Sequence, residues 1–229
     1  MGLLLEINPF ILLPLPTSPS SPLSAVEGID LLAEKHGVKE EVEELTHRAM
    51  NGHSSFAEAL ALRLSLVRPL KEDLVWLGQE YIRKIVPDTK KLIFDLKKNG
   101  KDVYIISGGF EIALKIFAKH IEIDETHVFS NILLFDRDGK YVGLDRKNPL
   151  SKDHGKRTVL KKIASLGFTL FVGDGVTDME AKDAVDLFVG FGGVKVRDLV
   201  KKEADVFLEE ATLEKIRLIA LGKTKTNLF

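Results

Sequence analysis

The sequence predicts an α/β protein in which a doubly wound parallel sheet carries an inserted bundle of helices. After Pro87, short apolar runs alternate with amphipathic helical segments, which is typical of parallel strands covered by helices on both faces. Between Val26 and Ile85, by contrast, apolar residues recur at helical spacing and no strand pattern occurs. We therefore expect a helical cap over residues 26–86 and an α/β core over residues 87–229.

The predicted core alternates between helix and strand along the chain. The helix DTKKLIFDLKKNG leads to the strand VYII, and the helix KRTVLKKIASLG leads to the strand TLFV. Between them a small hairpin is expected near residues 131–146, because Asp138-Gly139 is a favoured tight-turn pair. In sheets of this kind ligands bind at the carboxyl ends of the strands. The loops that follow VYII and TLFV are therefore the expected place for a site.

The first 25 residues differ in composition from the rest of the chain. They hold five of the eight prolines and a single charged residue, Glu6. Proline cannot donate to a strand ladder and is rarely found in a central strand. We expect residues 1–25 to form an atypical leader in place of the first core strand, as a disordered segment or an altered N-terminus.

Composition excludes several classes of protein. The net charge of the 229 residues is −1 and both signs are interspersed, which gives no electrostatic case for binding nucleic acid or an anionic membrane. The chain contains no cysteine, so disulfides and thiolate metal sites are excluded. Apolar runs are too short for a transmembrane helix. We expect a cytoplasmic monomer or homodimer whose partner is a small molecule.

Three glycine-bearing loops predict a site for a small anion. The segment Ser107–Gly109 is expected to follow a strand and open a helix, so that its amides and hydroxyl face a phosphate; an ordinary strand-helix turn is the alternative. Lys156 begins the next helix, either as a solvated residue or as a clamp on a phosphoryl group. Asp174 and Asp178 could hold a divalent metal, although Asp178 is also well placed to cap the following helix.

The order of these loops resembles the phosphoserine phosphatase family of the haloacid dehalogenase superfamily. The matching stretches include EGIDLLAEKHGV, RAMNGHSSFAEALALRLSL, VYIISGGFEIAL, HGKRTVLKKI and VGDGVTDMEA. The resemblance begins at about Glu27 and covers nearly the whole chain after the leader. It implies a haloacid dehalogenase-like core with an inserted cap. It also implies Mg²⁺-dependent hydrolysis of O-phospho-L-serine to serine and phosphate through an aspartyl phosphate.

Within the core, the resemblance implies that Ser107 hydrogen-bonds the phosphoryl oxygens, with Gly108 and Thr177 also binding the substrate. Lys156 would neutralise the phosphoryl charge. The two remaining core residues are assigned to the metal: Asp174 would bind Mg²⁺, and Asp178 would bind it or orient its water shell.

Within the cap, the resemblance implies that Glu27 faces the substrate ammonium and that Arg63 grips its carboxylate. Met50 and Phe56 would form an apolar wall. Arg63 follows Phe56 by seven residues and so lies on the same apolar helical face, where a cation is unexpected unless it binds a ligand. The alternative is that its charged end reaches the solvent. For Met50 and Phe56 the alternative is simple core packing.

The leader departs from the family at its reacting residues. The family's Asp-x-Asp motif provides the nucleophile and the general acid, and counting back nine residues from Glu27 places Ser18 and Ser20 at these positions. No aspartate precedes Asp30. A serine phosphate is a stable monoester and Ser20 has no proton to give near neutral pH, so we expect little or no turnover and weaker metal binding.

Three interpretations remain open. The chain is a phosphoserine phosphatase whose first 25 residues are altered by a frame error upstream of Val26, or a non-catalytic relative that binds phosphoserine or another phosphorylated metabolite. It could also be a phosphatase for another small phosphomonoester, such as a phosphosugar. Whether Glu27 and Arg63 face the site distinguishes a phosphorylated amino acid from the other ligands.

Overall fold

The computed structural model describes most of the chain, although for residues 10–13 and 50 it describes the backbone alone. The described residues are 10–13, 23, 27–50, 53–164, 167–192, 196–209 and 212–222. Their strands are β1 (Phe10–Leu13), β2 (Val103–Phe110), β3 (Val128–Asn131), β4 (Leu133–Phe135), β5 (Tyr141–Leu144), β6 (Thr169–Gly173), β7 (Leu187–Phe191) and β8 (Val206–Leu208). Their α-helices are α1 (Gly28–Lys35), α2 (Lys39–Met50), α3 (Phe56–Val67), α4 (Lys71–Arg83), α5 (Thr89–Lys98), α6 (Glu111–His120), α7 (Gly155–Ala164), α8 (Val176–Met179), α9 (Asp198–Glu203) and α10 (Leu213–Ala220). Short 3-10 helices among them are η1 (Glu125–His127), η2 (Pro149–Ser151) and η3 (Lys182–Ala184).

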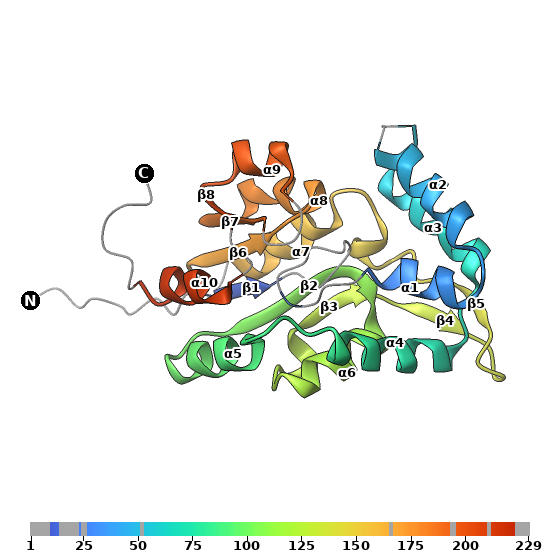
Figure 1. Cartoon of the computed structure of the whole chain (residues 1–229), viewed down its shortest axis with the longest axis horizontal. Coiled ribbons are helices and arrows are strands. Elements are labelled where there is room, and N and C mark those ends of the chain that lie inside the picture. The colour runs from blue at the N-terminus through green and yellow to red at the C-terminus, as the bar shows by residue number, and fades with distance from the viewer. Residues whose placement is uncertain are drawn as a thin grey trace, which may run out of the picture.

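One parallel sheet forms the core, with its strands in the order β3-β2-β1-β6-β7-β8 (Figure 1). Strands β4 and β5 pair antiparallel as a separate hairpin. Helices cover the sheet on both sides, with α5 and α6 on one side and α7 on the other. The predicted α/β class with a doubly wound parallel sheet is confirmed.

Strand β1 lies at the centre of the sheet. Its residues belong to the segment 1–25, which we expected to be an atypical leader in place of the first core strand. In the structure four residues of that leader form the strand, and Ile11 pairs with Val103 of β2 on one side and with Leu170 of β6 on the other. The four-residue run FILL contains no proline, so each of its residues can donate to a strand ladder.

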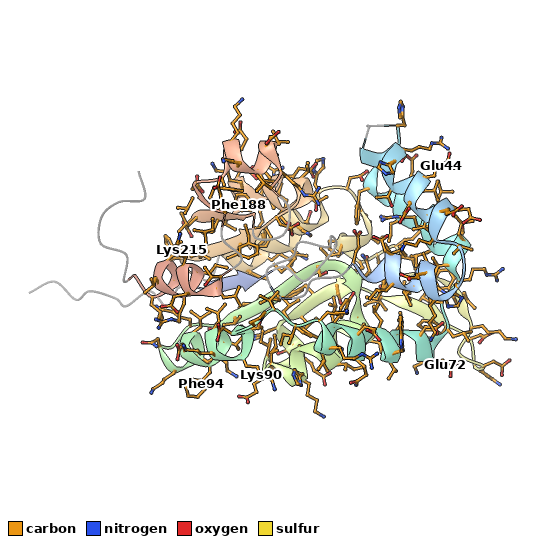
Figure 2. The ribbon with its side chains drawn as sticks, in the orientation of Figure 1. Glu44, Glu72, Lys90, Phe94, Phe188 and Lys215 are labelled. Carbon is orange, nitrogen blue, oxygen red and sulfur yellow. The ribbon has the colours of Figure 1, made fainter. Side chains whose placement is uncertain are left out.

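Residues of the central strands alternate between the two faces of the sheet. Ile105 and Val172 belong to the apolar cluster that contains α5, α6 and α10, whereas Ile106 and Phe171 belong to the cluster that contains α7 and α9. Because both faces are buried, these strands must be apolar throughout, which explains the continuous run TLFV. Figure 2 shows Phe188 of β7 inside the molecule, whereas Phe94 projects from the outer side of α5.

The inserted helices lie between β1 and β2 in the chain. Helices α1, α2 and α3 project beyond one end of the sheet, and α4 returns to pack along α6 (Figure 1). In the first turn of α4, Asp73 Oδ1 accepts from the Lys35 ammonium (2.6 Å), and Asp73 Oδ2 accepts from the Leu70 amide (2.7 Å) and lies 2.8 Å from His36 Nε2. These contacts fix the end of α1 against the start of α4. Among the described residues, no helix is long and apolar enough to cross a membrane.

Candidate active site

The segment Ser107–Gly109 forms a bulge inside strand β2. Ile106 pairs with Phe129 and Phe110 pairs with Asn131, so β2 advances four residues where β3 advances two. Residues 107–109 therefore leave the ladder, and α6 begins only at Glu111. This corrects the expectation that Ser-Gly-Gly opens the helix. The Ser107 hydroxyl accepts a hydrogen bond from the Gly109 amide (2.9 Å) and is fully buried, so it stabilises the bulge from within.

Lys156 and Asp178 form a buried ion pair between two helices. Lys156 lies in the first turn of α7, and its ammonium donates to Asp178 Oδ1 at 2.6 Å. Asp178 Oδ2 accepts from the Gly175 amide (3.0 Å) and the Asp174 amide (3.3 Å), as expected for a cap of α8. Gly173 permits this approach, because a Cβ there would lie 2.4 Å from Asp178 Cβ.

Asp174 is buried beside Arg197, a residue that motif reasoning missed. One guanidinium nitrogen of Arg197 lies 3.9 Å from Asp174 Oδ2. Arg197 Nε is buried and has no hydrogen-bond partner among the described residues. Arg197 precedes α9, and no pattern within its own segment signals a role, because its contact with Asp174 after β6 is a tertiary contact.

The described residues provide an incomplete donor set for Mg²⁺. Mg²⁺ prefers oxygen ligands in octahedral geometry, commonly one or two carboxylates with water and substrate oxygens. Asp178 accepts hydrogen bonds from Lys156 and from two backbone amides, and Asp174 lies beside the Arg197 guanidinium. In the described part of the chain, no group of three or more His, Asp or Glu side chains could hold a metal ion. These residues alone do not make the metal site that the resemblance implies.

The cap contributes a second buried pair, between Glu27 and Arg63. Glu27 precedes α1, and one of its carboxylate oxygens lies 3.8 Å from Arg63 Nη1 of α3. Burial and the neighbouring Asp30 raise the pKa of the Glu27 carboxyl from its ordinary 4.5 to about 8, and the attraction of Arg63 opposes this only in part. Burial also lowers the pKa of the Arg63 guanidinium. Arg63 does not snorkel, because it is only 7% exposed.

Residues of both the cap and the core line a cavity of about 720 Å³. Of the predicted residues, those that line it are Glu27, Phe56, Arg63, Gly108, Lys156 and Thr177. Ser107, Asp174 and Asp178 are buried and do not line the cavity, although each contacts or neighbours a residue that does. Ser18 and Ser20 lie outside the described residues, as does the side chain of Met50.

Comparison with known proteins identifies the family. The model of haloacid dehalogenase-like hydrolases matches residues 23–185, which is more than half of the chain. This chain is a haloacid dehalogenase-like hydrolase. Phosphoserine phosphatases are among its relatives: that of Bos taurus is 37% identical over 187 residues, covering 80% of this chain and 83% of that protein. That of Methanocaldococcus jannaschii is 32% identical over 197 residues, covering 83% and 89%.

Solved structures agree with this assignment. A phosphoserine phosphatase captured as a phospho-aspartyl intermediate analogue is 28% identical with a TM-score of 0.74, covering 96% of this hydrolase and 100% of that chain. A substrate-bound phosphoserine phosphatase complex is 28% identical with a TM-score of 0.73, covering 95% and 99%. The resemblance to the phosphoserine phosphatase family is confirmed, and this haloacid dehalogenase-like hydrolase is phosphoserine phosphatase-like.

The loop before α7 connects the cap of this hydrolase to its core. Asp153 Oδ1 accepts a hydrogen bond from the Ala57 amide in the first turn of α3, at 3.2 Å. His154 adopts a left-handed backbone conformation with φ of 56° and lies 3.1 Å from a Glu180 carboxylate oxygen. At Gly155 a Cβ would lie 2.2 Å from the Pro149 carbonyl oxygen, so the loop requires glycine there. The loop thus holds Lys156 and the cap at the same edge of the cavity.

Proposed function

We propose that this cavity binds O-phospho-L-serine and that the chain, with the N-terminal sequence it has, does not turn it over. The observation that carries the proposal is that Glu27 and Arg63 of the cap line the same cavity as Gly108 and Lys156 of the core. A ligand that fits these groups has an ammonium and a carboxylate at one end and a phosphate at the other.

The two ends of the cavity differ in charge. On the core side, the Lys156 ammonium and the Arg197 guanidinium line the cavity together with Gly108 and Gly109 of the bulge, which suits a phosphate. The cap end has an acid and a base side by side, which suits the two charges of an amino acid. An ammonium near Glu27 would favour the charged carboxylate and lower its pKa from about 8. A phosphosugar has no group that would use the charge of Glu27.

The lack of turnover follows from the residues between β1 and α1. The family's nucleophile stands at the end of the first strand, and β1 ends at Leu13. No aspartate or glutamate occurs between Leu13 and Glu27. The segment that follows the strand therefore has no carboxylate to take the family's roles of nucleophile and general acid. Loss of the general acid alone removes about 10²–10⁴-fold in rate.

Mg²⁺ remains the cofactor that the family implies, with Asp174 as the residue that would hold it. Bound Mg²⁺ would offset phosphoryl charge. Since Asp174 lacks the carboxylate partners of the family motif, we expect weak binding of the metal by this chain. Phosphoserine is then held mainly by the cations and amides of the protein itself.

Titration calorimetry with O-phospho-L-serine, inorganic phosphate and glucose 6-phosphate tests the proposal. We expect phosphoserine to bind more tightly than either other ligand. Arg63→Gln should reduce this affinity about tenfold or more, because a charge-assisted bond is lost from a buried site. Arg48→Gln, a change at an exposed arginine of α2, is the matched control and should leave it unchanged. Equal binding of glucose 6-phosphate would point instead to a different phosphomonoester.

A further inference from the structure

The bulge in β2 changes the partners that its backbone groups can have. The pairing of β2 with β3 is interrupted between Ile106 and Phe110, so Gly108 lies outside the regular ladder. A buried carbonyl that loses its ladder bond needs another donor, since an unsatisfied one is costly. Gly108 and Gly109 also line the cavity, so the conformation of this bulge sets where their backbone groups point.

Asn131 provides that donor. It is the last residue of β3 and is fully buried, and its Nδ2 donates to the Gly108 carbonyl oxygen at 2.8 Å. Its Oδ1 has no hydrogen-bond partner among the described residues. The side chain therefore has one strong contact, and this contact holds the middle of the bulge.

We propose that Asn131 is a positioning residue for the phosphate end of the site. By fixing the Gly108 carbonyl it sets the direction of the peptide that follows, whose N–H belongs to Gly109, and Gly109 in turn donates to Ser107 Oγ. Asn131 does not line the cavity, so it acts through the bulge and does not touch the ligand. The inference rests on the proposed function, because it assumes that the bulge receives a phosphate.

The sequence offers a matched control in Asn148. Its Nδ2 also donates to a backbone carbonyl, that of Ser130 in β3, at 2.7 Å, but it does not touch the bulge. Its Oδ1 accepts from the Leu150 amide, and a carboxylate can do the same. Asn148→Asp therefore removes the donor to the Ser130 carbonyl and keeps the acceptor for the Leu150 amide. Asn131→Asp likewise removes the donor to the Gly108 carbonyl.

Binding of O-phospho-L-serine and of inorganic phosphate, measured for the parent and both aspartate variants, tests the proposal. We expect Asn131→Asp to weaken both ligands about tenfold or more, because its carboxylate repels the Gly108 carbonyl. Asn148→Asp should lower Tm comparably and change both affinities by less than about twofold. Equal effects of the two variants on binding would make Asn131 a structural residue only and would overturn the proposal.

Hydrogen exchange at the Gly108 and Gly109 amides gives a readout that does not need the ligand. Exchange should be faster in Asn131→Asp and unchanged in Asn148→Asp. If the parent does not bind phosphoserine, the proposed function fails, and exchange alone then decides whether Asn131 positions the bulge; unchanged exchange in Asn131→Asp overturns it. If Asn131→Asp does not fold, Asn131→Ala, which adds no charge, is measured against Asn148→Ala with the same criteria.

Discussion

At the scale of single residues, opposite charges surround the proposed ligand. The pairs are Lys156 with Asp178, Arg197 with Asp174, and Arg63 with Glu27. All six side chains are largely removed from water, so the charged ones depend on their partners, and the Glu27 carboxyl, with a pKa of about 8, is largely protonated near neutral pH. A phosphorylated amino acid can exchange contacts with these pairs without bringing an unpaired charge into the cavity.

The pair of Lys156 with Asp178 should contribute strongly to stability. Lys156→Met leaves the Asp178 carboxylate buried without its cation, and we expect a loss of about 3–5 kcal/mol in the free energy of unfolding. The double variant Lys156→Met, Asp178→Asn should recover part of that loss, since no buried charge remains unpaired. Urea unfolding of the parent and the variants measures both. A Lys156→Met protein as stable as the parent would show that this ion pair does not contribute to the free energy of unfolding.

Glu27 should make stability depend on pH. Its pKa of about 8 in the folded chain lies above the ordinary 4.5, so the folded chain retains a proton that the unfolded chain releases. The free energy of unfolding is therefore highest below about pH 4.5 as far as this group is concerned, and the contribution is lost as the pH rises to about 8.

Glu27→Gln should remove this slope, because the amide does not titrate. Tm measured from pH 5 to about pH 8.5 should fall less steeply in the variant than in the parent. Glu44→Gln, at an exposed glutamate of α2 that Figure 2 shows at the surface, is the control. Parallel curves for parent and Glu27→Gln would mean that Glu27 titrates normally.

At the scale of helices and strands, the cap is held to the core by the loop before α7. The Asp153 carboxylate accepts from the Ala57 amide, at the N-terminal end of α3, where a negative charge is favoured. Asp153→Ala should therefore loosen the first turn of α3 relative to the core, whereas Asp153→Asn keeps an acceptor.

Hydrogen exchange in the first turn of α3 measures this. Amides there should exchange about two- to fivefold faster in Asp153→Ala, with a smaller change in Asp153→Asn. Amides of α5, a helix that does not contain or contact Asp153, serve as the internal reference. Identical exchange in all three proteins would show that the cap is held by other contacts.

The elements also show what could be predicted from sequence and what could not. Periodicity predicted the α/β class, because helices and two-sided strands leave repeating apolar patterns. It did not predict the bulge at Ser107–Gly109, since a bulge is defined by the register between β2 and β3, which are distant in sequence. Strand β1 was missed for a related reason: the run FILL is short, and only its two neighbours in the sheet mark it as a strand.

The residues of the candidate site also fall into those that the sequence could identify and those that it could not. Lys156, Asp178, Arg63 and Glu27 could be named from motifs, and the structure pairs them. Neither Arg197 nor Asn131 was given a role from the sequence, because their contacts with Asp174 and Gly108 are visible only in the folded chain. Their roles depend on tertiary contacts that no local pattern records.

At the scale of the whole molecule, a cavity of about 720 Å³ lies between a helical cap and the carboxyl edge of a parallel sheet. In the proposed function, Glu27 and Arg63 of the cap meet the amino acid, and Lys156 and Arg197 of the core meet the phosphate. We therefore expect binding to depend on the protein's own groups more than on a metal, since no group of three or more His, Asp or Glu side chains in the described part of the chain could hold one.

Removing divalent metal should consequently have little effect on binding. We expect EDTA to change the Kd for O-phospho-L-serine by less than about threefold, as measured by calorimetry. In the Asp174→Asn variant, the Kd for O-phospho-L-serine should change equally little when Mg²⁺ is added. A tenfold or greater loss on adding EDTA, reversed by Mg²⁺, would show that residues outside the described part complete a metal site.

Release of phosphate from O-phospho-L-serine by the purified chain in the presence of Mg²⁺, with binding measured on the same preparation, tests the proposed function most directly. We expect binding at one site per chain and no release above the rate without protein. Repeated turnover would contradict the proposed function, because a group other than a carboxylate after β1 would then be attacking phosphorus.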